Sequence, residues 1–226
     1  MQGQFEICYR VLKKFKENKI LDKLVLFGSW CGYYYKFYFQ DEDYTFQLQT
    51  KDMDFAIAIP PKIGVQVDLP SLLESLDFIP DPSISTRDVF LHSEIKLEFF
   101  VPLRGSKDKD SYYIKELNIR AGFLRHLDML LDETITTVVD DLEIRLPNPL
   151  VYGLHKLIVS TRRRERGKTQ KDTLQGLEML SYLYKRGFGA EIQRRLYSLS
   201  KNKRKAIRKV IRDFEVIEDP VIGLLQ

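Results

Sequence analysis

The chain has 226 residues, of which 44% are hydrophobic and 30% charged, so it can bury a substantial core and is not composed like a disordered protein. Its apolar runs are too short to cross a bilayer and its first residues do not resemble a secretory signal, so we expect no membrane contact. The net charge is only +4, and two distant cysteines, Cys8 and Cys31, argue against a disulfide framework or a cysteine-based metal site and favour a reducing, cytoplasmic setting.

The first half of the chain alternates short apolar runs with amphipathic segments, which is typical of a mixed α/β (α+β) fold. Alternation is clearest at residues 52–59, where Asp52 and Asp54 share the face opposite Met53 and Phe55, until two prolines end the strand. In chain order, the patterns predict helices at 5–15, 30–39 and 69–76 and strands at 24–27, 52–59, 89–91 and 94–101, the last two antiparallel. Less regular runs predict further strands at 127–131, 134–139 and 142–146.

The composition changes near Pro147, after which helical spacing replaces strand patterning. Four helices are predicted there, at 150–164, 169–185, 190–198 and 201–214. We therefore expect an α/β domain at 1–147 and a helical domain at 148–226. Lys and Arg are dense at 162–171 and 194–212, which suits a polyanion such as a triphosphate or RNA, although a solvated helical face gives the same pattern.

Three features of the first half combine into a candidate phosphate-binding site. One predicted strand ends in Gly28 and Ser29, a second carries Asp52 and Asp54, and a third carries Glu98. Carboxylates two residues apart on a strand point the same way, and a cation between them relieves their repulsion. Mg²⁺ suits this position because it binds one or two carboxylates and completes its shell with phosphates and water. Glu98 would add a third carboxylate, while Gly28 and Ser29 would contact a phosphate.

Two other features allow more than one interpretation. The tyrosines at 33–35 would stack on a base if exposed, but an aromatic run at helical spacing favours a place in the core. Lys168, Lys171, Asp172 and Gln175 recur at helical spacing, so they form one polar stripe. That stripe would clamp a triphosphate if it faced the carboxylates, and a surface pair between Asp172 and Lys168 is the alternative.

These segments resemble the nucleotidyltransferase superfamily. "LFGSWCGYYYKFY", "TKDMDFAI" and "IKLEFFVPL" are similar to its pattern of a hydrophobic strand ending in Gly-Ser, an Asp-x-Asp strand and a third acidic strand. "NPLVYGLHKLIVSTRRRERGKTQKDTLQ" resembles a motif of one branch, a family of bacterial nucleotidyltransferase-like proteins related to the toxin subunits of abortive-infection toxin–antitoxin systems. The resemblance covers roughly residues 24–175.

The resemblance implies a nucleotidyltransferase fold with a mixed sheet, followed by a C-terminal helical bundle. It implies that Asp52, Asp54 and Glu98 hold Mg²⁺, with two ions expected, and that Gly28 and Ser29 contact the phosphates of an NTP such as ATP. It also implies nucleotide-binding positions in the helical part, to which the polar stripe adds Lys168; together these are Lys156, Arg163, Lys168, Lys171 and Asp172.

The predicted activity is transfer of a nucleoside monophosphate from an NTP to an acceptor hydroxyl, with release of pyrophosphate. The alternative is a non-catalytic nucleic-acid-binding or regulatory protein on a degenerate nucleotidyltransferase fold, including one member of a toxin–antitoxin pair. In that case the basic helices at 194–212 would bind RNA. In an enzyme, the same helices would position a tRNA or another polyanion as the acceptor. The acceptor and the nucleobase are not identified by the sequence.

Overall fold

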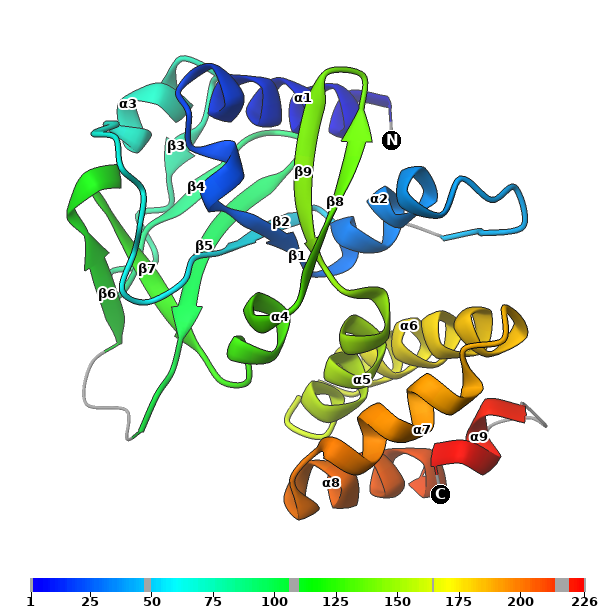
Figure 1. Ribbon diagram of the computed structural model, residues 1–226. Helices are drawn as coiled ribbons and strands as arrows, with labels where there is room; N and C mark the ends of the chain where they lie inside the picture. The colour runs from blue at the N-terminus through cyan, green and yellow to red at the C-terminus, as the bar shows by residue number, and fades with distance from the viewer. Residues whose placement is uncertain (1, 47–49, 106–109, 164, 214–219, 226) are drawn as a thin grey trace. The chain divides into compact units, whose positions relative to one another are not determined.

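The computed structural model describes residues 2–46, 50–105, 110–163, 165–213 and 220–225. The chain divides into two compact units, Met1–Pro147 and Asn148–Gln226, and each is described by itself (Figure 1). The division falls where the sequence changes composition. That the two units are separate domains stays a prediction.

In the described part of the first unit, seven strands form one mixed sheet and two more form a hairpin. The sheet contains β1 (Val25–Phe27), β2 (Asp52–Ala56), β3 (Ile79–Pro80), β4 (Val89–Leu91), β5 (Lys96–Pro102), β6 (Ser111–Ile114) and β7 (Ile119–Leu124). Its order is β1-β2-β5-β4-β3, with β7 also beside β5 and β6 beside β7. The pairs β2/β5 and β5/β7 are parallel and the others antiparallel, and β8 (Thr134–Val139) and β9 (Leu142–Pro147) make the hairpin.

One face of the central strands builds the core of this unit. Phe55 of β2 and Phe99 of β5 are register partners whose rings stack 5.8 Å apart, and both are fully buried. Phe15 of helix α1 (Gln2–Glu17) meets Phe55 edge-on at 5.3 Å, so α1 covers this face. Because strand side chains alternate, burying Met53 and Phe55 on this side turns Asp52 and Asp54 to the other.

Helix α2 (Ser29–Phe39) follows β1 directly and is buried along much of its length. Tyr34 and Tyr35 are both buried, and the Tyr35 hydroxyl donates to the carbonyl oxygen of Pro147 at 2.8 Å. The interpretation of these two tyrosines as core residues is therefore confirmed. The remaining short helices of the unit are η1 (Leu21–Lys23), α3 (Leu69–Glu74), η2 (Lys115–Leu117) and α4 (Asp128–Asp132).

The second unit is a helical bundle of α5 (Pro149–Ser160), α6 (Arg166–Lys185), α7 (Gly189–Ser198), α8 (Lys201–Asp213) and α9 (Pro220–Leu225). Its first helix begins with a cap that the sequence specifies. The side-chain oxygen of Asn148 accepts from the backbone N–H of Leu150 at 3.0 Å, and Pro149 occupies the first turn. Among the described helices, none combines the length and the apolar content needed to cross a bilayer.

The sequence predicted the main strands and helices but made one wrong assignment and several omissions. Residues 127–131 are not a strand, because α4 occupies them, with Leu127 and Leu130 buried three residues apart on one helical face. The strands β3, β6 and β7 and the helix α9 were not predicted. The helix predicted at 201–214 is confirmed up to Asp213, and residue 214 lies outside the described residues. The helix predicted at 150–164 is confirmed as α5 but ends at Ser160, because residues 161–163 leave the helix in a turn, and residue 164 lies outside the described residues.

Replacing Phe99 with Ala should lower the free energy of unfolding by about 3–5 kcal/mol, because it leaves a cavity beneath α1 between Phe15 and Phe55. Denaturant titration would measure this. Val138→Ala on the exposed side of β8 is the control and should change stability by no more than about 0.5 kcal/mol. A loss as small as the control's would contradict the placement of Phe99 in the core.

Candidate active site

The register of β2 and β5 brings the predicted carboxylates to one face of the sheet. Asp54 lies opposite Glu98, and Asp52 lies opposite Lys96. Register partners on parallel strands point their side chains to the same side, so Asp52, Asp54, Lys96 and Glu98 form one polar patch on the face away from α1. The pairing of β2 with β5 thus brings together the three carboxylates that the sequence predicted to share a site.

Gly28 lies against this patch, at the turn from β1 into α2. Its backbone has φ 75° and ψ −152°, a conformation that side chains rarely adopt. A Cβ built on Gly28 would lie 2.7 Å from Oδ2 of Asp54, closer than real Cβ contacts occur. Glycine is therefore required here for two reasons, and its absent side chain lets the Asp54 carboxylate sit directly beside the turn. Ser29, the first residue of α2, is buried.

Glu98 is the most enclosed of the three carboxylates, with only 5% of its surface exposed. Its Oε2 lies 2.6 Å from Nζ of Lys96, and its Oε1 accepts from a terminal guanidinium nitrogen of Arg87, also at 2.6 Å. Each oxygen therefore has its own cation. A buried carboxylate needs such partners, because an uncompensated charge would be expensive to remove from water.

Lys96 also reaches Asp52, with 3.2 Å between its Nζ and Oδ1 of the carboxylate. Burial by itself lowers the pKa of Lys96, but hydrogen bonds and attraction from Glu98 and Asp52 outweigh it and raise the pKa above its ordinary value. The ammonium is therefore held in its charged form between two carboxylates. Asp52 keeps nearly half of its side chain, 47%, exposed to solvent.

The donor groups at this patch fit a divalent cation on one side. Asp52 and Asp54 offer two carboxylates beside the Gly28 turn, and Mg²⁺ needs only one or two when phosphates and water complete its shell. A larger protein cage is not formed: within the described residues, no cluster of three or more His, Cys, Asp or Glu side chains is arranged to hold a metal ion. Glu98 faces its two cations instead.

A hollow of about 500 Å³ lies elsewhere on this unit, beyond the C-terminal end of β2. Two of the three cations that line it, Lys23 and Arg145, are engaged: Lys23 pairs with Asp22, and Arg145 donates to the carbonyl oxygen of Asp22 at 3.0 Å and to the Thr134 hydroxyl at 3.1 Å. Neither Asp52 nor Asp54 lines this hollow. The carboxylate patch, and not the hollow, is therefore the candidate site.

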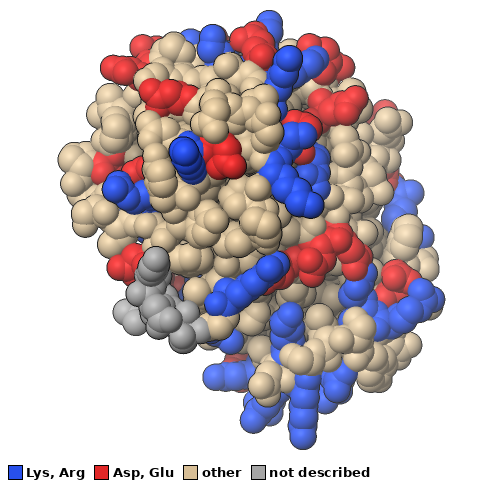
Figure 2. Space-filling view, turned by 60° about the vertical axis from the view of Figure 1, so that its left-hand side comes forward, with Lys and Arg blue, Asp and Glu red and all other residues tan. Residues whose placement is uncertain are grey.

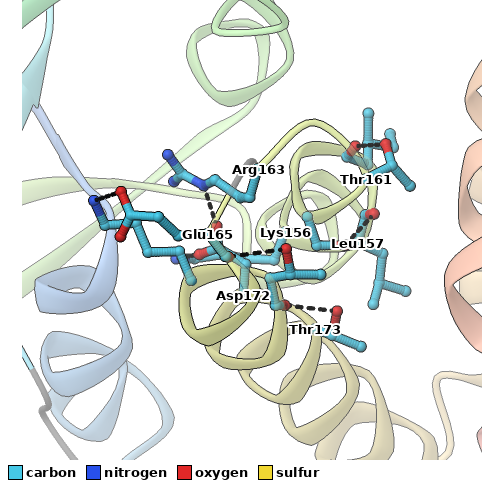
Figure 3. A network of polar contacts seen from close by, with 11 residues as sticks. Lys156, Leu157, Thr161, Arg163, Glu165, Asp172 and Thr173 are labelled. Carbon is cyan, nitrogen blue, oxygen red and sulfur yellow. Dashed lines mark hydrogen bonds and ion pairs between the residues drawn. The ribbon is translucent and has the colours of Figure 1, made fainter.

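The helical unit contains a second charged network, between α5 and α6 (Figure 3). Asp172 is buried, and its two oxygens each lie 2.7 Å from a cation: Nζ of Lys156 and Nε of Arg163. Lys156 is equally enclosed, whereas the Arg163 side chain is 46% exposed. Burial raises the pKa of Asp172, but the charges and hydrogen bonds of Lys156 and Arg163 outweigh it and lower the pKa below its ordinary value.

Among the positions predicted to bind nucleotide, Lys156, Arg163 and Asp172 are therefore in mutual contact. Lys168 is not part of this network, because its Nζ pairs with Glu165 at 2.9 Å on the surface. The alternative of a surface pair between Asp172 and Lys168 is wrong. Lys171 neighbours Asp172 on α6, and both belong to the helical unit. That this part of α6 faces the carboxylates stays a prediction.

Comparison with known proteins assigns the family. A family model described as nucleotidyltransferase matches residues 6–196. The chain belongs to the nucleotidyltransferase family. The expected fold class, a mixed α/β sheet followed by a helical bundle, is therefore confirmed, and nucleotidyl transfer is the general activity of this family. No curated protein matches the sequence.

Two solved structures have a similar chain trace. One is an antigenic nucleotidyltransferase-like protein from Paracoccidioides brasiliensis, with 11% identity over 95% of this chain and 88% of that one, at a TM-score of 0.49. The other is the antibiotic-resistance factor ANT(2'')-Ia, with 8% identity over 99% and 89% of the two chains, at a TM-score of 0.44. The bacterial abortive-infection branch stays a prediction.

Sequence reasoning did not identify Lys96 and Arg87 as residues of the nucleotidyltransferase site. Lys96 had a usable signal, because it precedes Glu98 by two residues on the same strand and so shares its face. Arg87 had none, since it lies in the irregular segment before β4, and only the pairing of β4 with β5 brings it to Glu98.

Replacing Asp172 with Asn should lower the free energy of unfolding by about 3–5 kcal/mol at neutral pH, because Lys156 is left buried without its anion. The folded-state pKa of Asp172 is depressed, so its stabilising effect is present above the unfolded-state value and is lost as pH falls through the folded-state value. The gap between wild type and variant should therefore narrow below the ordinary Asp value of 3.8.

Denaturant titrations from neutral to acidic pH would measure that gap. Asp213→Asn is the matched control in the same unit, since Asp213 is exposed and lies 3.8 Å from Arg212. The free energy of unfolding of the Asp213→Asn variant should equal that of the wild type at each pH. A gap for Asp172→Asn that stays constant down to the acid limit would contradict the assignment of a depressed pKa.

Proposed function

We propose that this nucleotidyltransferase moves a nucleoside monophosphate from an NTP to an acceptor hydroxyl, using Mg²⁺ bound by Asp52 and Asp54. One observation carries the proposal: both carboxylates share a face of β2, and Asp54 lies directly against the Gly28 turn that opens α2. Family membership supplies the reaction class, and this patch supplies acidic groups beside a turn that brings backbone close to a phosphate.

The metal ion would neutralise charge on the triphosphate and polarise the phosphorus–oxygen bonds. Asp52 and Asp54 would fix the position of the triphosphate through that ion. The turn at Gly28 and the N-terminus of α2 would present backbone N–H groups and a positive dipole end to the phosphates. Ser29, the first residue of that helix, would add a hydroxyl donor near the same phosphates.

The proposed transfer needs no reactant besides the NTP and the acceptor. The acceptor oxygen forms a bond to the α-phosphorus as the bond from that phosphorus to the α–β bridging oxygen breaks in line with it. Pyrophosphate leaves with the bonding electrons, and the acceptor proton passes to water. Glu98 takes no direct part in this scheme, because its two oxygens already neutralise Lys96 and Arg87.

In the helical unit, we propose that Lys156 and Asp172 are a structural pair that orients Arg163. Asp172 accepts from Nε of Arg163, and the terminal nitrogens of this half-exposed guanidinium would donate to an anionic group of a substrate. Lys168 and Lys171 would contribute charge along the same helix. These three cations would bind phosphate, and their role does not depend on metal binding by Asp52 and Asp54.

The exposed surface of α8 supports a polyanionic acceptor such as a tRNA or another RNA. Figure 2 shows Lys and Arg side chains gathered over the helical unit. On α8, the buried side chains Ile207, Val210 and Ile211 define one face. The opposite face carries exposed cations at helical spacing, namely Lys201, Lys205, Arg208, Lys209 and Arg212. Within the described residues, Arg212 is the one cation of this face that forms an ion pair, with Asp213.

A second function in a different class would use the same surface without catalysis, as a nucleic-acid-binding or regulatory protein. The carboxylates of the first unit favour the enzyme, since they would repel a nucleic acid lying on them. A cytoplasmic location and a role in a toxin–antitoxin pair remain predictions from the sequence.

Replacing Asp54 with Asn should reduce Mg²⁺-dependent pyrophosphate release from an NTP by a factor of about 10³ or more, because one of the two proposed metal ligands loses its charge. Pyrophosphate release with each NTP and a cell extract as the acceptor source would be measured. Asp77→Asn is the control, since Asp77 is exposed and its φ of 64° suits asparagine equally well. Full turnover by Asp54→Asn would end the proposed mechanism.

Replacing Lys205 and Lys209 with Ala should weaken binding of single-stranded RNA and reduce the slope of log K against log salt concentration by about 0.7 for each phosphate that the variant no longer neutralises. Fluorescence anisotropy over a range of salt concentrations would measure both quantities. Lys13→Ala on α1, an exposed lysine of the first unit, is the control. An unchanged slope in the double variant would show that α8 does not bind the polyanion.

A further inference from the structure

The carboxylate patch already contains one cation at a place where a second metal ion would be expected. A two-ion phosphoryl-transfer site stabilises both the attacking and the leaving oxygen, and the sequence resemblance implied that a third carboxylate helps to hold the ions. In this chain the third carboxylate is Glu98, and the cation beside it is the Lys96 ammonium. The ammonium nitrogen lies 2.6 Å from Oε2 of Glu98 and 3.2 Å from Oδ1 of Asp52. It therefore bridges the carboxylates of two neighbouring strands.

Both oxygens of Glu98 are engaged by resident cations. Oε2 belongs to Lys96, and Oε1 accepts two hydrogen bonds from Arg87, at 2.6 and 3.3 Å. The residue is almost fully buried, so water cannot take over if either cation leaves. Direct coordination by Glu98 would therefore place a metal ion next to a resident cation or displace that cation, in a place with little solvent to replace it.

Arg87 is held in its position by packing as well as by charge. Its side-chain stem crosses Gly122 of β7, where a Cβ would come within 2.7 Å of Cδ of Arg87. Its guanidinium carbon lies 5.8 Å from the centre of the Phe100 ring, within the range of a cation–π contact. Phe100 and Gly122 are register partners on β5 and β7, so the two strands together form the seat for this arginine.

The formal charges of the patch also favour a single divalent ion. Asp52, Asp54 and Glu98 carry three negative charges, and Lys96 and Arg87 carry two positive ones. Among these five groups the negative charges exceed the positive ones by one, and a single divalent ion would reverse that excess. A second divalent ion would meet the Lys96 ammonium at close range, where repulsion is strong.

We infer that the site takes a single divalent cation for each bound nucleotide and that the Lys96 ammonium substitutes for the second. The inference rests on the proposed function, since it concerns the same carboxylates. It changes the sequence-based expectation of two ions and gives Glu98 the role of a positioning residue, which holds Lys96 and Arg87 in place.

The number of bound metal ions tests this inference without measuring turnover. Equilibrium dialysis would fix the free concentrations of Mn²⁺ and of an NTP analogue with a methylene group between its α- and β-phosphorus atoms. The excess of manganese and of nucleotide on the protein side would then be counted. The wild type should retain about one Mn²⁺ for each nucleotide, against the two of a two-ion site.

Replacing Lys96 with Met should raise the ratio to about two, because Asp52 and Glu98 then lack their shared cation and can hold an ion. Lys51→Met is the matched control, because Lys51 is an exposed lysine immediately before β2. This variant should bind the same number of Mn²⁺ ions per nucleotide as the wild type. Lys96→Arg, which keeps a positive charge, should also stay at the wild-type ratio. Circular dichroism would establish that each variant is folded.

Two ions per nucleotide in the wild type would overturn the inference and leave the proposed function intact, and this result does not depend on the folding of any variant. A folded Lys96→Met protein with the wild-type ratio would also overturn it, because the ammonium would then not be what excludes the second ion. Absence of retained nucleotide in the wild type would overturn the proposed function and the inference with it.

Discussion

The in-register parallel pairing of β2 with β5 is the constraint on which the site depends. It aligns Phe55 with Phe99 on the face beneath α1, and it aligns Asp54 with Glu98 on the other face. The buried aromatic pair fixes the register, since a shift by one residue would exchange the two faces of either strand. The core and the polar patch are therefore two results of the same alignment, and the apolar face supplies the free energy that holds the carboxylates together.

Carboxylates held this close require compensation, and the chain provides it in two ways. The buried Glu98 has two resident cations, Lys96 and Arg87, whereas Asp52, which shares Lys96, and Asp54 are partly exposed. Under the proposed function, the Mg²⁺ of the substrate complex would bind the partly exposed pair, and Glu98 would stay neutralised by its resident cations. Three acidic residues that look equivalent in a motif would then have different tasks. The helical unit repeats the principle, because the buried Asp172 is neutralised within its own network.

The sequence by itself determined much of the fold. Alternation at 52–59 predicted a half-buried strand, which the structure has over Asp52–Ala56, three residues shorter than predicted. The turn after β1 correctly preceded a buried helix, because period and punctuation are local properties. The change of composition near Pro147 coincides with the division into two compact units. The sequence was weakest at 127–131, where a short apolar run fits a strand or a single buried helical turn equally well, and only packing decides between them.

For the site, the sequence determined which carboxylates would share a face, because a spacing of two residues fixes direction along one strand. Only the tertiary structure decided which cations reach them. Arg87 meets Glu98 because β4 pairs with β5 and because Gly122 leaves room for its stem, and neither fact has a local signal. Lys156 likewise looks like a phosphate-binding lysine in the sequence, yet the packing of α5 against α6 buries it beside Asp172. Charge partners across strands and helices are long-range contacts, so residue spacing does not specify them.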